Sequence, residues 1–425
     1  MVNALFILVI GLGAAFLLGL LRETQRNTAY AITLSALAAM AWIAHSWLWL
    51  FAVDGSASID VFTAGTTPPF AINLRISIAE AVLVLLVIMS GLLSAIYMKC
   101  SLLRLGHRAM SVLLVFIMAL CGIILTRDIF NLFVFFELAV IATAGLLLLS
   151  DDKRALAAGF KYLIISQLVS IFLLTGIIFT YHAGGTLNID GLAELSPQIL
   201  TGVGSLAFFF MFIAIITEAK PFPANGWALD IYESAHPAFS ALFSAAMAGA
   251  AAVFAVDKLL LIGGQAWLPV VTAIGLLSFV AANLLALSQS NDRRTLGYSS
   301  VGQVGLILVV IGQRDLLGEH YLFIAGGIIL SHAVAKAGLY WLSGLIPQRE
   351  LTAWSVLRRH PLLIFAFVSF ITMLSGLPPF PGFYAKWELV MLLASADHLW
   401  ILALILIGSL LEAGYLFRWF GYILK

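Results

Sequence analysis

The stretch Ile213-Ala-Ile-Ile-Thr-Glu-Ala-Lys-Pro-Phe-Pro-Ala-Asn-Gly-Trp227 interrupts an apolar run with charged residues, two prolines and a glycine. Unpaired backbone groups at membrane depth are so costly that such a break is tolerated only against protein or a water-filled cavity. Ionisable residues at that depth are candidates for an ion or proton path. One interpretation therefore places a transport site around Glu218 and Lys220. The other ends the helix at Lys220 and makes the remainder a loop.

The composition of the chain is that of a polytopic helical membrane protein. Of its 425 residues, 62% are hydrophobic and only 10% are charged, and apolar runs of spanning length recur throughout. A net charge of +1 does not suggest nucleic-acid binding. No polar block is long enough for a nucleotide-binding or iron–sulfur domain, and Cys100 and Cys121 lack metal or redox spacing. We therefore expect no cofactor and no metal site.

Apolar runs of about 18–24 residues, the length that crosses a bilayer, predict thirteen spans. They cover residues 3–21, 28–53, 75–97, 109–126, 129–150, 159–182, 202–220, 236–256, 265–289, 297–313, 320–346, 361–395 and 399–422. The first run has no basic segment before it and no small-residue cleavage site after it, so we expect a retained span. The twelfth contains Gly376-Leu-Pro-Pro-Phe-Pro-Gly382, which predicts a second broken helix.

The lysines and arginines predict the orientation of the chain. Fifteen of the 22 lie in loops after odd-numbered spans or at the C-terminal end. The four on the other side are Arg75, Arg127, Lys258 and Arg314. The remaining three, Lys220, Lys336 and Lys386, are expected inside the membrane rather than at its surfaces. Because basic loops stay in the cytoplasm, we expect a multi-pass protein of the inner (cytoplasmic) membrane, with the N-terminus outside and the C-terminus in the cytoplasm.

A short internal similarity links the two predicted breaks. Lys220-Pro-Phe-Pro223 in the seventh span is matched by Pro378-Pro-Phe-Pro381 in the twelfth. The seventh and twelfth spans are five spans apart. Because this number is odd, the chain crosses the membrane in opposite directions in the two spans. Paired broken helices in inverted repeats point to the binding site of secondary transporters.

Glu137 is an acidic residue in an otherwise apolar span. It lies within Phe130-Asn-Leu-Phe-Val-Phe-Phe-Glu-Leu-Ala-Val-Ile-Ala-Thr143, where nearly all its neighbours are apolar. Burial moves the pKa values of carboxylates and lysines toward the range in which protons are exchanged at neutral pH. A proton path is one interpretation. The alternative is a carboxyl group that only hydrogen-bonds a neighbouring helix.

Later spans carry further titratable residues. His332 and Lys336 are four residues apart and share one face of a helix, which favours a proton relay over a lone packing histidine. Lys386 follows the second break by four residues, although its long side chain can also extend to the membrane surface. Glu412, in the last span, is compatible with a role in the path or at a subunit contact.

Five segments in combination carry a family resemblance. They are Asp128-Ile-Phe-Asn-Leu-Phe-Val-Phe-Phe-Glu137, Lys161-Tyr162 with Tyr181 and Gly185-Thr-Leu-Asn188, Asp292-Arg-Arg-Thr-Leu-Gly-Tyr-Ser-Ser300 with Gln303 and Gly305, His332 with Lys336, and Gly376-Leu-Pro-Pro-Phe-Pro-Gly-Phe-Tyr-Ala-Lys386. They resemble the antiporter-like, proton-conducting membrane subunits of respiratory complex I (NADH:quinone oxidoreductase), Mrp-type cation/proton antiporters and energy-converting hydrogenases. The Mrp and hydrogenase types are the most similar.

The resemblance implies an all-α polytopic fold with two inverted five-helix repeats, in which helices 7 and 12 are broken. The expected parts are an N-terminal three-helix segment (1–108), a first repeat with helices 4–8 (109–260) and a second with helices 9–13 (261–425). By resemblance Glu137, Lys336 and Lys386 belong to a polar axis that joins two half-channels, and His332 bridges it. Glu218 and Lys220 join this proton path through the break, and Asp292 and Glu412 are further candidates.

Two positions depart from the family pattern. The seventh helix of the family has a lysine five residues before a proline and nine before a tryptophan, and counting back from Pro223 and Trp227 gives Glu218. Lys220 is two residues later, which turns a helix by about 200°. If Glu218 lies near Glu137, the two carboxyl groups would share a proton; if Lys220 turns in, a salt bridge forms instead. Where the family has a lysine or histidine in the eighth helix, this chain has Met247.

Three functional hypotheses remain. The leading one is a proton- or cation/proton-translocating subunit of a multisubunit membrane complex, in which other membrane subunits and hydrophilic redox subunits supply the driving reaction. The second keeps the fold but makes the chain a structural or coupling subunit with a degenerate first half-channel, because of Glu218 and Met247. The third is a stand-alone secondary transporter, of sodium or of an anion such as bicarbonate. No redox reaction is expected of the chain itself.

Overall fold

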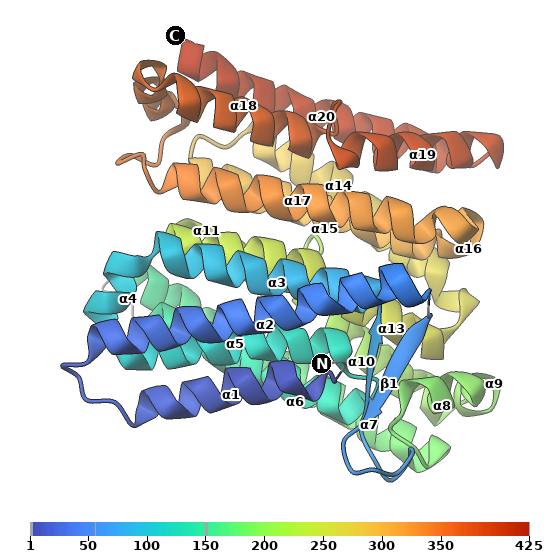
Figure 1. Ribbon diagram of the computed structural model, residues 1–425. Coiled ribbons are helices and arrows are strands. Elements are labelled where there is room, and N and C mark those ends of the chain that lie inside the picture. Colours follow the sequence, from blue (N-terminus) through green and yellow to red (C-terminus); the bar gives the residue numbers. More distant parts are fainter. Residues whose placement is uncertain (1–2, 56, 149–151, 425) are drawn as a thin grey trace. The chain divides into compact units, whose positions relative to one another are not determined.

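The computed structural model describes residues 3–55, 57–148 and 152–424 and is almost entirely helical (Figure 1). The chain divides into two compact units. The first comprises Met1–Glu218 and Phe254–Gly264, and the second comprises Ala219–Val253 and Gln265–Lys425. The chain thus passes from the first unit to the second between Glu218 and Ala219, inside the predicted break of the seventh span.

The first unit is a helical bundle with one β-hairpin. Its elements are α1 (Leu5–Gly19), α2 (Arg26–Asp54), β1 (Ser58–Phe62), β2 (Asn73–Ser77), α3 (Ile78–Tyr97), α4 (Lys99–Leu105), α5 (His107–Leu125), α6 (Ile129–Leu148), α7 (Lys153–Gly184), α8 (Ile189–Glu194), α9 (Ser196–Ile199), α10 (Val203–Glu218) and most of α13 (Val253–Gly263). The strands pair antiparallel, with Asp60 opposite Arg75. Ser77 and Glu80 form a capping box that begins α3, since each side chain binds a backbone N–H at that helix end.

The second unit is helical in all its described elements. They are α11 (Gly226–Ser234), α12 (Pro237–Leu242), the π-helix η1 (Phe243–Ala252), η2 (Gln265–Trp267), α14 (Leu268–Leu287), α15 (Asp292–Gly312), α16 (Arg314–Leu317), η3 (Gly318–His320), α17 (Tyr321–Ser343), η4 (Leu351–Arg359), α18 (Pro361–Ser375), α19 (Pro381–Ser395) and α20 (Leu399–Leu424). Within it α14 packs against α15 and α20, and α17 packs against α15, α18 and α19.

The helices confirm a polytopic membrane protein. Among the described residues, ten helical segments are long and apolar enough to cross a bilayer, and three shorter apolar helices are α1, α10 and α18. Each of the thirteen predicted spans has a helix at its position. The total of thirteen crossings stays a prediction, because three of these helices are shorter than a full span.

Both predicted helix breaks are present. Helix α10 ends at Glu218 and α11 begins at Gly226, while α18 ends at Ser375 and α19 begins at Pro381. Lys220 (φ 61°) and Gly376 (φ 71°) adopt the left-handed conformation that terminates helices. Residues 219–225 therefore lack regular helix, as the loop interpretation expects, but Glu218 and Lys220 are buried at 4% and 1% exposure. The charged residues of the break are therefore interior, whereas Pro223 and Ala224 are exposed.

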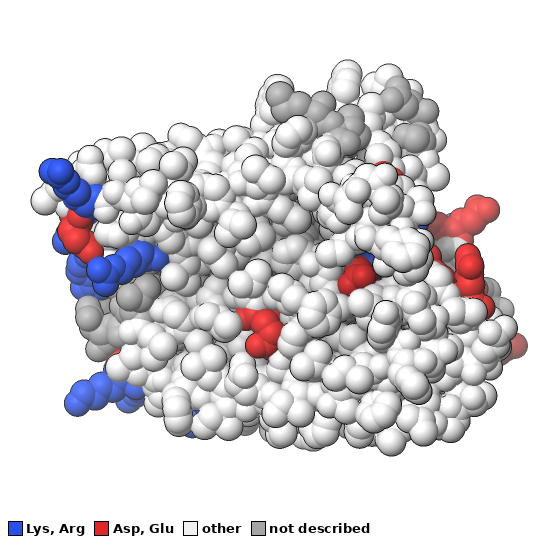
Figure 2. Space-filling view, turned by 90° about the horizontal axis from the view of Figure 1, so that it is seen from below, with Lys and Arg blue, Asp and Glu red and all other residues white. Residues whose placement is uncertain are grey.

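Most basic residues on the face shown in Figure 2 gather at its left end, whereas acidic residues lie in its middle and at its right end. In the first unit, the exposed lysines and arginines all follow odd-numbered spans; they are Arg22, Arg26, Lys99, Arg104, Arg108, Lys153, Arg154 and Lys161. Arg75 and Arg127 are less exposed and both pair with Asp190. Lys258 corrects our sequence assignment, because it lies buried within α13 rather than in a loop.

Candidate functional site

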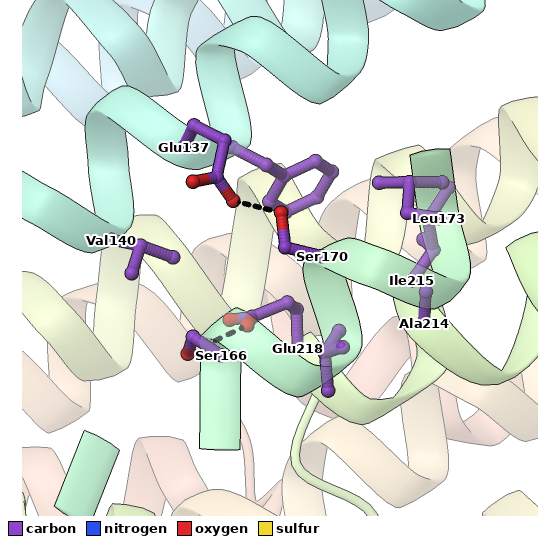
Figure 3. Close-up of a pocket in the computed structure, with 10 residues that line it drawn as sticks. Glu137, Val140, Ser166, Ser170, Leu173, Ala214, Ile215 and Glu218 are labelled. Carbon is purple, nitrogen blue, oxygen red and sulfur yellow. Dashed lines mark hydrogen bonds between the residues drawn. The ribbon is translucent and has the colours of Figure 1, made fainter. Parts of the chain in front are cut away.

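Two carboxylates face one small cavity in the first unit (Figure 3). Glu137 comes from the middle of α6, and Glu218 is the last residue of α10. The cavity has an empty volume of ≈ 260 Å³, its open side included. Its other lining residues are Phe136, Val140, Ser166, Val169, Ser170, Leu173, Ala214 and Ile215. Of the two arrangements expected for this region, the cavity supports Glu218 beside Glu137 rather than a salt bridge formed by Lys220.

Helix α7 supplies the hydroxyl groups of this cavity. Ser170 donates a hydrogen bond to Glu137. Ser166 Oγ donates to Glu218 over 3.2 Å, and the Tyr162 hydroxyl donates to the same carboxylate over 3.4 Å. These three donors are spaced four residues apart and share one face of α7. Our sequence analysis missed both serines, although hydroxyl residues at that spacing in an apolar helix were the available signal.

The hydroxyl groups of α7 link the two acids of this cavity to one helix. Hydroxyl groups donate and accept hydrogen bonds and can therefore connect such acids. Figure 3 shows the hydrogen bonds of Ser170 with Glu137 and of Ser166 with Glu218 as dashed lines.

Lys220 lies in the second unit against aromatic rings. Its Nζ is 3.8 Å from the ring centroid of Phe243 and 5.7 Å from that of Trp227. A cation over a ring face is stabilised by the ring's negative π surface. The left-handed backbone at Lys220 redirects the side chain after the end of α10.

His332 and Lys336 are buried one turn apart on α17. His332 Nε2 lies 3.3 Å from the carbonyl oxygen of Ser244, in the π-helix η1. Lys336 is 0% exposed and donates to the carbonyl oxygen of Leu296 over 3.0 Å. Gly249 of η1 leaves room for the imidazole, because a Cβ there would lie 2.5 Å from His332 Cδ2. Both side chains thus lie buried on the same helix, each with its own backbone partner, and the relay stays a prediction.

Lys386 and Glu412 form a buried ion pair with 3.1 Å between Nζ and Oε2. The Lys386 side chain is 12% exposed and Glu412 is 0% exposed. Lys386 thus points inward rather than toward the membrane surface. Glu412 cannot reach a subunit contact through its side chain, because it is enclosed within the second unit.

Asp292 is separate in role from these residues. It stands at the start of α15, where it accepts hydrogen bonds from Ser343 (2.7 Å) and from the indole N–H of Trp354 (3.2 Å). A carboxylate at a helix N-terminus is stabilised by the helix dipole. This geometry is that of an anchor between α15, α17 and η4.

Lys258 is a buried cation that sequence reasoning placed in a loop. Its Nζ donates to three carbonyl oxygens at the end of α5, those of Ile123 (3.0 Å), Ile124 and Thr126 (2.8 Å). A lysine at a helix C-terminus satisfies carbonyls that have no intrahelical partner. Among the described residues, no group of three or more His, Cys, Asp or Glu could hold a metal ion.

Comparison with known proteins adds to this geometry. The family model of the NADH:quinone oxidoreductase/Mrp antiporter transmembrane region matches residues 126–412. The chain belongs to this family. The match extends from the start of α6 to Glu412 and includes all the candidate residues described above.

Individual relatives within the NADH:quinone oxidoreductase/Mrp antiporter family are similar over most of the chain. NADH-quinone oxidoreductase subunit N of Desulforudis audaxviator is 32% identical over 373 residues, which cover 84% of this chain and 74% of that protein. A Na(+)/H(+) antiporter subunit of Alkalihalophilus pseudofirmus is 29% identical over 313 residues, 71% of this chain and 62% of that protein. The resemblance to antiporter-like membrane subunits is thereby confirmed.

A solved structure shows the same fold. A chain of the membrane-bound sulfane sulfur reductase, an archaeal respiratory membrane complex, has a TM-score of 0.89 and 28% identity, covering 98% of this chain and 86% of that one. These three relatives come from complexes with different reactions, so the part they share is the membrane subunit itself.

Proposed function

We propose that this chain is an antiporter-like subunit of a multisubunit membrane complex and carries protons through the bilayer. The path uses Glu137 and Glu218 in the first unit and Lys220, His332, Lys336 and Lys386 in the second. Family membership supports the antiporter-like assignment, since the named relatives are subunits of NADH-quinone oxidoreductase and of a Na(+)/H(+) antiporter. The chain itself supplies titratable groups, and partner subunits supply the redox or antiport reaction.

The observation that carries this proposal is the environment of Lys336. Its ammonium group is fully buried in the middle of α17, and its hydrogen bond in the described part of the chain goes to the Leu296 carbonyl rather than to a carboxylate. A buried cation without a contacting anion is expensive, so such residues inside membranes mark ion and proton pathways. His332, one turn away, gives Lys336 a neighbour that can exchange protons.

Replacing Lys336 by Ala tests this function. In the complex reconstituted into vesicles, we expect proton translocation to fall by about tenfold or more while the subunits still assemble. The measurement is acidification of the vesicle lumen, with subunit content checked on the same sample. Lys153→Ala, an exposed lysine at the start of α7, is the matched control and keeps normal transport. Normal translocation in an assembled Lys336→Ala complex would contradict the proposal.

The variant Glu137→Gln distinguishes a proton-carrying subunit from a structural subunit whose first half-channel is inactive. If the Glu137–Glu218 cavity holds a transported proton, removing one carboxylate abolishes the shared site and lowers coupled translocation by about tenfold or more. The proton itself can be followed through the infrared absorption of protonated carboxyl groups. An unchanged coupled activity in Glu137→Gln would favour the structural subunit, for which the departures at Glu218 and Met247 are the sequence evidence.

The proposed location is the inner (cytoplasmic) membrane, with the N-terminus outside and the C-terminus in the cytoplasm. The exposed basic residues after odd-numbered spans in the first unit support this orientation. The proposed partners are other membrane subunits, and hydrophilic redox subunits where the complex is an oxidoreductase. Purification of the chain alone as an active transporter would instead support a self-sufficient carrier.

A further inference from the structure

The 3₁₀-helix η4 connects two apolar helices of the second unit, α17 and α18, and packs against α18 and α20. A 3₁₀-helix has three residues per turn, so residues three apart share one face. Leu351, Trp354 and Leu357 form a buried face of this kind. The ring centroid of Trp354 lies 4.5 Å from that of Trp419 and 5.3 Å from that of Phe367. One face of η4 is therefore fixed on the helices, while its other residues are half-buried or exposed.

Two exposed arginines, Arg358 and Arg359, end η4. The Arg358 guanidinium donates to a backbone carbonyl oxygen at the end of α20. In the described part of the chain, neither arginine is paired with a carboxylate. Residues 344–360, which link α17 to α18, hold three arginines but a single acid, Glu350. The positive charge at the end of η4 is therefore not neutralised by the linker itself.

Large apolar side chains follow these arginines directly. Helix α18 begins at Pro361, and in its first turns Leu362 is 82% exposed and Phe365 is 72% exposed. The two are three residues apart and share one face of the helix, and helical side chains point toward the helix N-terminus. Val356 of η4 is a further exposed apolar residue, at 47%. An exposed apolar surface thus adjoins the cationic end of η4.

We propose that this surface binds an anionic phospholipid. Its phosphate would lie on Arg358 and Arg359, because guanidinium groups bind phosphate oxygens through paired N–H donors. Its acyl chains would cover Leu362 and Phe365 at the start of the apolar helix α18. An acidic segment of a partner protein would complement the arginines alone, whereas a phospholipid complements the charged and the apolar part together. In the orientation proposed above, the lipid belongs to the cytoplasmic leaflet.

The test uses the purified complex in lipid nanodiscs, with a fluorophore on Ser355→Cys in a Cys100→Ala background. Cys121 is buried and stays unlabelled. Ser355 lies one 3₁₀ turn before Arg358, about 6 Å along the helix axis. The probes are phosphatidylglycerol and phosphatidylcholine that carry the same nitroxide on an acyl chain and quench the fluorophore at short range. Each arginine near an anionic headgroup contributes about a fivefold preference, so phosphatidylglycerol should quench at a mole fraction lower by about tenfold or more.

Three variants separate the arginines from the general charge of the chain. Arg358→Gln combined with Arg359→Gln should remove the preference, and Arg359→Gln alone should lower it about fivefold. The single variant keeps the bond of Arg358 to α20, so it serves as the test if the double variant does not assemble. Lys153→Gln combined with Arg154→Gln, an exposed basic pair at the start of α7, removes the same charge and should keep the preference.

Three results would overturn the inference. The first is equal quenching by the two lipids in the complex without arginine substitutions, and the second is an undiminished preference in the arginine variants. The third uses a benzophenone maleimide on the same cysteine: cross-linking to another subunit without any lipid preference would assign the surface to an acidic protein segment. Lipid binding is measured without proton translocation, so this inference can fail while the proposed function stands.

Discussion

Lys258 shows how a buried lysine can serve structure rather than transport. Its ammonium group binds three carbonyl oxygens at the end of α5, immediately before the junction that starts α6. In that junction Asp128 Oδ1 accepts from the backbone N–H of Asn131 over 2.7 Å and begins the helix that carries Glu137. Lys258 therefore orders the entry to α6 through three carbonyl oxygens at one helix end, whereas Lys336 donates to one carbonyl oxygen, that of Leu296 within α15.

Replacing Lys258 by Met is expected to destabilise the protein. Methionine fills a similar volume but leaves the buried carbonyl oxygens without their donor, which costs about 1–3 kcal/mol for each buried group left unpaired. The free energy of unfolding, measured by titration with SDS in mixed micelles, reports the loss. Lys153→Met at an exposed position is the control and should change it by less than about 0.5 kcal/mol. If Lys258→Met and Lys153→Met had the same free energy of unfolding, the cost of burying the Lys258 ammonium would equal the stabilisation from its hydrogen bonds, which would contradict the prediction.

At the scale of elements, the β1–β2 hairpin is held by charges in addition to the buried side chains of Leu74 and Ile76. Arg75 binds Asp60 across the two strands over 2.9 Å and reaches Asp190 of α8 over 3.0 Å. Arg127, between α5 and α6, binds the same Asp190. Four charged residues from four parts of the first unit thus form one network, which ties the hairpin to the helices.

The hairpin should lose this support in acid. Burial alone would raise the pKa of Asp60, but hydrogen bonds from Arg75 and Asn73 and the positive charge of Arg75 hold it below its ordinary value of 3.8. A lowered carboxylate pKa stabilises the fold above the ordinary value, and this contribution disappears as the pH falls through the lowered one. Asp60→Asn should therefore weaken hydrogen-exchange protection of the hairpin amides at pH 7, and native and variant proteins should converge as the pH falls through the lowered pKa of Asp60. A difference that persists in acid would contradict the electrostatic origin.

For the whole molecule, hydropathy and helix-breaking residues were sufficient to predict the fold class. Lipid contact requires long apolar helices, and proline with glycine ends them, so the helix positions and both breaks could be read from residue type. Residue type does not show how deep a single long side chain lies. Lys258, near the end of a predicted span, was therefore placed in a loop. Ser166 and Ser170 were also missed, because each serine was read alone and their four-residue spacing with Tyr162 was not considered. The division into two units depends on contacts between helices and leaves no local pattern in the sequence.

The native cysteines allow the orientation to be measured. Cys100 is exposed in α4, after the third span, whereas Cys121 is buried in α5. A cytoplasmic loop predicts that a membrane-impermeant maleimide labels Cys100 in inside-out vesicles but not in right-side-out vesicles. The control is Ser58→Cys in a Cys100→Ala background, because exposed Ser58 in β1 lies after the second span and should show the opposite pattern. Labelling of Cys100 from the outside would reverse the proposed topology.

One backbone arrangement occurs twice along the chain. In the first unit Ile129 N–H donates to Leu187 O (2.9 Å) and Ile189 N–H to Arg127 O (2.8 Å). In the second, the corresponding pair runs from Asp292 N–H to Arg349 O (2.8 Å) and from Leu351 N–H to Ser290 O (2.9 Å). Each pair of bonds connects the start of one predicted span to the loop that follows the next span along the chain. Because such bonds do not depend on side-chain identity, two segments can differ in sequence and still keep the same backbone register.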